Sequence, residues 1–223
     1  MKRRNFLQLS AFAGVGLTLP MSGLLNACTN HPEHSLEFKN LITDLLKDWS
    51  DGMLKVQINN PSNLEVHGAL GCPSCSHIHG RCMDAVYPFL HMADKTGDEK
   101  YVEGAKLVMT WAENNVSQEN GAWTVIKNPK SWKGITIFGA IALAEALHYH
   151  GHVLDEETRK AWTVRLEKAG QYIYDTFTID FTNINYPGTA VYGLNLIGGV
   201  VNRDDFKVKS KKLASEVKAY FTE

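Results

Sequence analysis

Apolar and charged positions alternate along this chain in a pattern that recurs three times. Helical runs rich in small residues and poor in charge begin near Gly80, Gly134 and Asn185. They lie about fifty residues apart, which is a repeat length typical of stacked helical hairpins. A short turn and a charged amphipathic run follow each of them, at 98–115, 155–173 and 204–221. Asp155 is the expected N-cap of the second charged run, and Pro88 should kink or restart the first apolar helix. The pattern therefore predicts an all-α fold of repeated helix pairs.

The alternation also predicts where each helix lies. The apolar first helices, at 81–96, 135–150 and 185–201, are expected inside the array, and the charged second helices outside with one face in water. That arrangement is an α/α toroid. With a long helix at 36–58, the chain supplies about three and a half hairpins, whereas a closed ring of six needs on the order of a hundred more residues. We therefore expect an incomplete toroid, and the first part of a longer protein rather than a short open array.

The N-terminus reads as an export signal. Lys2, Arg3 and Arg4 precede Phe6-Leu7, and an apolar stretch follows at 9–25. This stretch is too short and too rich in glycine for a spanning helix, and it fits the h-region of a signal peptide. The Arg-Arg-x-Phe-Leu string resembles the twin-arginine signal, which exports folded proteins. The protein is thus expected in the periplasm, at the outer membrane or on the cell surface.

The end of this leader resembles a bacterial lipobox. Leu25-Asn26-Ala27-Cys28 would make Cys28 the lipidated first residue of the mature chain. The predicted organisation is then a signal peptide at 1–27, a polar tether at 28–35 and a helical domain at 36–223. Lipid at Cys28 would be the only attachment to a membrane. The alternative is cleavage elsewhere in the leader, with Cys28 discarded or left as a plain thiol.

The charge balance excludes one class of partner. The chain has 23 basic and 24 acidic side chains, and removal of the leader takes away three basic and no acidic ones. Such a weakly negative protein has no basic field for nucleic acid, and it carries no nucleic-acid-binding motif.

Three phrases at the starts of the apolar helices suggest a family. The strings HGALGCPSCSHIHGRCMDAVYPFL, SWKGITIFGAIALAEAL and TNINYPGTAVYGL resemble those of exported bacterial α/α-toroid proteins of polysaccharide breakdown. This group includes heparinase-like and alginate-lyase-like polysaccharide lyases, and toroid glycoside hydrolases such as β-glucuronidases. The resemblance covers about residues 64–202. It implies cleavage of an acidic polysaccharide or oligosaccharide and does not name the sugar.

The residues themselves point to a site on one rim. All inner helices of a hairpin ring run in one direction, so the loops before their N-termini gather together. Helix N-termini also present free N–H groups that suit anionic ligands. Three polar clusters fall there: His77, His79, Arg81 and Asp84; Trp132 and Lys133; Asn183, Asn185 and Tyr186. A site that cleaves sugars needs aromatic faces, amide and cationic donors, and groups that transfer protons.

Two mechanisms fit these side chains. In β-elimination, Arg81, Lys133, Asn183 and Asn185 would bind the uronate carboxylate, with His79 and Tyr186 as base and acid. In hydrolysis, a pair of carboxylates is the usual requirement. Asp84 is the best rim carboxylate for that role, with Glu65 and Asp180 as weaker candidates. The lack of an obvious second acid favours elimination slightly.

A cysteine cluster indicates a structural zinc site. Cys72, Cys75 and Cys82 lie within eleven residues, together with His77 and His79. Thiolate and imidazole are the ligands that zinc prefers, so three thiols with His77 or His79 would complete a four-coordinate site. A disulfide with one spare cysteine is the main alternative in an oxidising compartment, and free thiols are the other.

Two hypotheses without catalysis remain beside the enzyme. One is a glycan-binding surface lipoprotein, and the other is a helical-repeat scaffold held together by its zinc site. Depolymerisation of a substrate separates the enzyme from the binding protein. Loss of glycan binding in a Trp132→Ala variant separates the binding protein from the scaffold.

Overall fold

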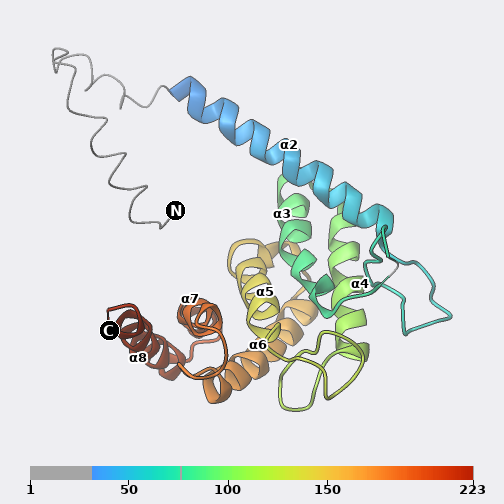
Figure 1. The fold of residues 1–223 in the computed structure, drawn as a ribbon. Helices are drawn as coiled ribbons and strands as arrows, with labels where there is room; N and C mark the ends of the chain where they lie inside the picture. Colours follow the sequence, from blue (N-terminus) through green and yellow to red (C-terminus); the bar gives the residue numbers. More distant parts are fainter. Residues whose placement is uncertain (1–31, 76, 223) are drawn as a thin grey trace, which may run out of the picture. The chain divides into compact units, whose positions relative to one another are not determined.

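The computed structural model describes residues 32–75 and 77–222 of the chain (Figure 1). The predicted signal peptide and Cys28 lie outside the described residues. The chain divides between Asp44 and Leu45 into two compact units, and each is described by itself. The first unit contains the start of helix α2, and the second contains its end and all other elements.

Helix α2 runs from Pro32 to Val56. Its backbone is helical from Pro32 onward, so the last four positions of the predicted tether are helical. Proline is tolerated there because the first turn of a helix needs no backbone N–H donor. Within the first unit, the described side chains at 36–44 are exposed. Within the second, Ser50 is fully buried and Asp51 accepts a 2.8 Å hydrogen bond from the hydroxyl of Tyr101.

Three helical hairpins build the second unit. They pair α3 (Val86–Thr96) with α4 (Glu99–Asn115), α5 (Thr136–His150) with α6 (Glu156–Thr176), and α7 (Asn185–Val200) with α8 (Asp204–Tyr220). The first helices pack on one another, α3 on α5 and α5 on α7, and each also packs on its own partner. This is the inner and outer arrangement of an α/α toroid, so the predicted fold class is confirmed (Figure 1).

The first inner helix restarts two residues before Pro88, as this proline predicts. A 3₁₀ helix, η2 (Gly80–Ala85), comes first, and the α-helix begins only at Val86. Pro88 thereby occupies the first turn of α3, where its missing N–H breaks no hydrogen bond. The change of helix type also sets the direction of the side chains just before α3.

Side-chain caps begin two of the outer helices, α4 and α6, whereas α8 has no such cap. The side chain of Asp98 accepts from the backbone of Lys100 at 3.0 Å and begins α4, and Asp155 does the same for α6 through Thr158 at 2.7 Å. The cap at Asp155 was predicted and is confirmed. These local bonds satisfy free N–H groups at each helix start.

The core lies between the inner and outer helices. Among its fully buried side chains are Phe89, Tyr101, Trp123, Phe177 and Phe206. Glycine allows the closest approach: a Cβ on Gly170 of α6 would lie 2.6 Å from Phe206 and 2.8 Å from Ile197.

Loops rather than sheets join these helices. Within the described residues no β-strand forms, and three isolated bridges hold the loops, among them Gly71 with Ile78 and Ser117 with Trp123. None of the described helices is both long and apolar enough to cross a bilayer.

Candidate functional site

Four of the residues predicted on the rim lie close together, and a phenylalanine lies between them. The guanidinium of Arg81 lies 4.5 Å from the ring centre of Phe138, near the start of α5. Phe138 in turn lies 5.7 Å from Tyr186 of α7, and Tyr186 lies 5.6 Å from Trp132. We call Arg81, Asp84, Trp132, Phe138 and Tyr186 the rim cluster. Three inner-helix starts, far apart in sequence, therefore contribute to one surface.

Trp132 is held in place on several sides. Its indole stacks on Phe181 at 5.6 Å, and its Nε1 donates to the hydroxyl of Tyr186 at 3.3 Å. Gly134 lies so close that a Cβ there would be 2.3 Å from the indole. The side chain still exposes part of its surface, since 43% of the residue is accessible. A rigid, partly exposed aromatic ring is suited to contact a sugar face.

Arg81 and Asp84 form a close ion pair. The Asp84 Oδ2 atom lies 2.7 Å from Nε and 2.6 Å from the terminal nitrogen of Arg81. Burial raises the pKa of the Asp84 carboxyl, and the charge of Arg81 opposes this effect. The other oxygen, Oδ1, is buried and has no hydrogen-bond partner among the described residues. Asp84 thus orients Arg81 and balances much of its charge.

A pocket of about 430 Å³ opens beside this pair on the inner face of the array. We call it the inner-face pocket; its lining consists of Arg81, Asp84, Tyr87, Phe138, Ile141, Ala142 and Glu145. The carboxylate of Glu145 accepts a short hydrogen bond from the hydroxyl of Tyr192 on α7. This bond raises the pKa of Tyr192 to about 12. Burial, with the nearby charge of Glu145, also raises the pKa of Tyr87, so both phenols remain proton donors at neutral pH.

His79 precedes η2 and caps it. Its Nδ1 accepts the backbone N–H of Arg81 at 3.1 Å, and the residue is exposed. In a neutral imidazole only one nitrogen accepts, so this contact leaves the proton on Nε2. The free side of His79 is therefore a hydrogen-bond donor, so in this state its Nε2 cannot take a proton as the base.

Asn183, Asn185 and Lys133 differ in their exposure and in their hydrogen bonds. Asn183 and Asn185 are exposed and flank Tyr186 in sequence, at the start of α7. Lys133 is half-buried, and its ammonium donates to the carbonyl of Pro129. Lys133 must break that contact before it can bind a substrate carboxylate.

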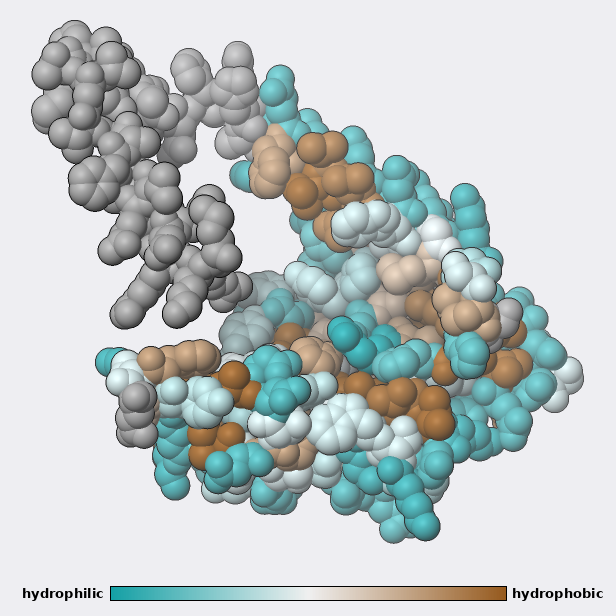
Figure 2. Space-filling view, viewed as in Figure 1, coloured by the Kyte–Doolittle hydropathy of each residue, from teal (hydrophilic) through white to brown (hydrophobic). Residues whose placement is uncertain are grey.

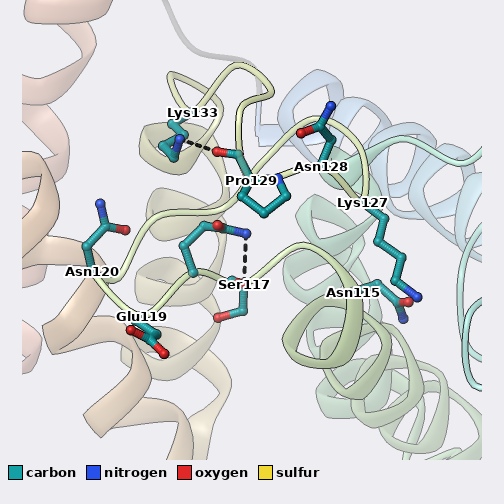
Figure 3. A pocket seen from close by; sticks show the side chains of 9 residues that line it. Asn115, Ser117, Glu119, Asn120, Lys127, Asn128, Pro129 and Lys133 are labelled. Atoms are coloured by element: carbon teal, nitrogen blue, oxygen red, sulfur yellow. Dashed lines mark hydrogen bonds between the residues drawn. The ribbon is translucent and has the colours of Figure 1, made fainter.

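Lys133 also lines a second pocket, on the loop between α4 and α5 (Figure 3). Amides and ammonium groups surround this cavity of about 670 Å³. Most of them already have protein partners: Lys127 pairs with Glu65 at 2.7 Å, and the amide of Asn115 donates to Leu64 at 3.0 Å. Glu65, a weaker candidate for acid catalysis, is thus part of this loop contact and not of the rim cluster.

The side chains of the four predicted zinc ligands do not converge on one point. Cys82 is buried and its thiol donates to the carbonyl of Leu70 at 3.3 Å, whereas Cys75 is exposed and His77 contacts the backbone of Cys75. Within the described residues, no three His, Cys, Asp or Glu side chains are arranged to hold a metal ion. Cys72, Cys75 and Cys82 are free thiols, and hydrogen bonding from Cys75 lowers the pKa of Cys72. The zinc site remains a prediction, which metal analysis of the purified chain can test.

Sequence reasoning missed Phe138, Glu145 and Tyr192. A signal for one of them was present, because Glu145 is the only carboxylate in the otherwise apolar run at 135–150. A charge at the middle of an inner helix costs energy unless it faces a polar partner or a site. Phe138 and Tyr192 gave no such signal, since aromatic residues in inner helices usually belong to the core.

Comparison with known proteins gives three findings. The model of the ulvan lyase N-terminal domain family matches residues 46–223. A broad-specificity ulvan lyase of Formosa agariphila is 76% identical over 222 residues, which is 100% of this chain and 35% of that protein. The chain thus spans about a third of this relative. A solved polysaccharide lyase covers 78% of this chain and 34% of its own, with 11% identity and a TM-score of 0.43.

Proposed function

The chain belongs to the ulvan lyase N-terminal domain family. We propose that it forms at least part of a lyase that cleaves ulvan or a similar uronic-acid polysaccharide by β-elimination. The observation that carries this proposal is the 76% identity, over the whole chain, to a broad-specificity ulvan lyase. Both the family and the relative are named for lyases, which supports elimination over the hydrolysis also considered for this chain.

The rim cluster supports the same reaction. Elimination requires that the substrate carboxylate be neutralised, so that the proton on the neighbouring C5 becomes acidic. Arg81 supplies a cation there, and Asn183, Asn185 and Lys133 supply further donors. Asp84 orients Arg81 through their ion pair and is not needed as a hydrolytic acid.

Tyr186 would then move the proton. Its phenol oxygen, which already accepts from Trp132, takes the C5 proton in its deprotonated form. The C5–H electrons form the C4–C5 double bond as the C4–O bond breaks. The neutral phenol gives its proton to the leaving oxygen, to which the Nε2–H of His79 donates a hydrogen bond. Trp132 presents its partly exposed ring to a neighbouring sugar.

The experiment that tests this proposal follows two products at once. The purified chain is incubated with ulvan, and both the ultraviolet absorbance of the unsaturated sugar and the number of reducing ends are recorded. Elimination raises both signals, whereas hydrolysis raises only the reducing ends. Reducing ends without absorbance would overturn the lyase assignment.

A matched pair of arginine variants tests the site. Arg81→Ala should lower kcat/KM about a hundredfold or more, because it removes charge that stabilises the developing enolate. Arg159→Ala is the control, since Arg159 is an exposed arginine of the outer helix α6. Equal activity of the two variants would remove Arg81 from the site.

A binding protein without catalysis is the second candidate, favoured by the exposed ring of Trp132. In that case the purified chain binds ulvan oligosaccharide and releases no product. Trp132→Ala then weakens the binding.

Export and lipid attachment at Cys28 belong to the same proposal. They are inferred from the leader sequence, and a polysaccharide too large to enter the cell requires an enzyme outside it. Labelling of the expressed protein with a radioactive fatty acid tests the anchor. A Cys28→Ser variant should lose the label, and label retained by that variant would contradict the anchor.

A further inference from the structure

A chain of hydrogen-bonded side chains joins the ends of α3 and α5, apart from every group used above. Asp94 Oδ2 lies 3.1 Å from Nδ1 of His150, and Nε2 of His150 lies 3.2 Å from Nδ1 of His91. The second carboxylate oxygen of Asp94 contacts Nε2 of His152 at 2.8 Å. We call Asp94, His150 and His91 the histidine relay.

The geometry of the histidine relay fixes its protons. A carboxylate only accepts, so Nδ1 of His150 carries a proton toward Asp94. In a neutral ring, Nε2 of His150 is then an acceptor, and Nδ1 of His91 must donate to it. The outer nitrogen of His91, Nε2, is left as a lone pair with no partner among the described residues. The whole relay therefore has one consistent state at neutral pH.

The surroundings favour that neutral state. His150 is 6% exposed and His91 is half-buried. Burial lowers the pKa of both rings, and in His150 the carboxylate of Asp94 opposes the effect only in part. The other titratable groups that face the relay are Lys95, His152 and Tyr149. Lys95 disfavours further positive charge on both rings, and a protonated His152 disfavours it on His150.

Tyr87 connects the histidine relay to the inner-face pocket. Its ring lies 5.8 Å from that of His150 and 6.5 Å from that of His91, which follows it by one helical turn. The same tyrosine lines the pocket opposite Glu145. The relay therefore supports one wall of the pocket, although it takes no part in the lining itself.

We propose that Asp94 and His150 are positioning residues for the inner-face pocket: through His91 and Tyr87 they hold its α3 wall against α5 and release it on acidification. The proposal rests on the proposed function for what the pocket binds, namely a sugar unit of the polysaccharide.

Protonation acts in two steps with different consequences. The first proton goes to the outer nitrogen of His91, and the relay survives because Nδ1 of His91 still donates to His150. A second proton must enter Nε2 of His150, where it replaces an acceptor by a donor. Two N–H donors then face each other, and the hydrogen bond between His91 of α3 and His150 of α5 breaks. The two rings titrate as a pair rather than independently.

Nuclear magnetic resonance of the imidazole nitrogens in the purified chain tests the relay without any ligand. We expect Nδ1 to carry the proton in both rings, with Nε2 of His91 the first nitrogen to titrate. His91 and His150 should titrate below the ordinary range of an imidazole, because burial lowers the pKa of both rings. The ring signals of Tyr87 should shift with the second step. His148→Gln is the control, because His148 lies exposed at the same end of α5, and this variant should keep the Tyr87 shift. Tyr87 signals that do not follow the second step would overturn the proposal.

A variant separates positioning from simple support of the fold. In His150→Gln, the amide donates to Asp94 and the carbonyl accepts from His91, but residue 150 itself can no longer take up a proton. Wild-type affinity for an ulvan oligosaccharide should fall about tenfold per pH unit once the second protonation begins. The profile of His150→Gln should be flat over this range, and His148→Gln should behave as wild type.

The outcomes distinguish the two proposals. If the oligosaccharide binds at no pH, the proposed function is overturned, and the Tyr87 signals of wild type and His150→Gln still decide the relay. If both proteins show the same pH profile in binding or in the Tyr87 signals, the positioning role is overturned while the proposed function stands.

Discussion

Arg165 of α6 shows how one residue can order a whole loop. It is 8% exposed, and its Nε lies 2.8 Å from both carboxylate oxygens of Glu113. Its terminal nitrogens donate to the carbonyls of Gly121 and Ala122, and its guanidinium lies 3.7 Å from the ring centre of Trp123. Together these contacts fix the segment that leads to Trp132 and the rim cluster.

Replacement of Arg165 by alanine should destabilise the fold by about 3 kcal/mol, because it removes the cation that pairs with Glu113 and the donor to the carbonyl of Gly121. Urea denaturation followed by circular dichroism measures the change. Arg159→Ala, on the exposed part of the same helix, should lie within about 0.5 kcal/mol of wild type. Equal midpoints for the two variants would show that the network adds no net stability.

Single residues also mark the limit of the sequence at the site. Arg81, Trp132 and Tyr186 were predicted on the rim because they precede or begin inner helices, and they do lie together there. Phe138, which joins them, was not predicted, since nothing local tells a core phenylalanine from one that faces a neighbouring helix. The position of the proton on the His79 ring could not be predicted either, because it depends on the hydrogen bond from the backbone N–H of Arg81.

Helices in this protein approach one another most closely where glycine allows it. Gly170 of α6 faces Phe206 of α8 and Ile197 of α7, with no room for a methyl group. Gly199 of α7 is the opposite case, since a Cβ there would meet nothing within 4 Å. Alanine substitutions at these two positions therefore distinguish the effect of close packing from the effect of helix propensity.

Gly170→Ala should destabilise the protein by about 1–3 kcal/mol, because a methyl group would force α6 away from its neighbours. Gly199→Ala should instead stabilise it by about 0.5–1 kcal/mol, since alanine favours a helix over glycine. Thermal or urea unfolding of the pair is the measurement. Stabilisation by both variants would mean that α6 shifts freely to accommodate the methyl group.

At the scale of elements, the sequence predicted more than it missed. The three helix pairs and the cap at Asp155 follow from short-range patterns, which tertiary contacts did not override. The break between η2 and α3 was only partly foreseen. Pro88 marked the place, but the change to a 3₁₀ helix depends on how His79 caps it and how Cys82 and Met83 pack.

The second unit as a whole is an array in which each hairpin contacts mainly its neighbours. α8 packs mainly on α7 and less on α6, whereas α4 packs mainly on α3 and η2. Side-chain pairs also link α4 to the end of α2 and to α6. Stability in such arrays is approximately a sum of local terms and nearest-neighbour terms. A defect at one end should therefore weaken that end first.

Phe206→Ala makes this testable, because Phe206 is fully buried on α8. The loss of its ring should cost about 3–5 kcal/mol. Hydrogen exchange followed by mass spectrometry should show faster exchange in α7, α8 and the facing part of α6, with α3 and α4 still protected. Uniform acceleration across all helices would show instead that the unit unfolds in one cooperative step.

The sequence by itself determined the helix pairs, their inner and outer order and the rim on which the inner helices begin. It could do so because helical periodicity, capping and turn residues act over a few positions of the chain. Only the tertiary structure decided that Glu145 meets Tyr192, that His91 meets His150 and that the Cys82 thiol meets the carbonyl of Leu70. Those outcomes depend on the rotation and spacing of helices that lie far apart in sequence, and the packing of the core sets both.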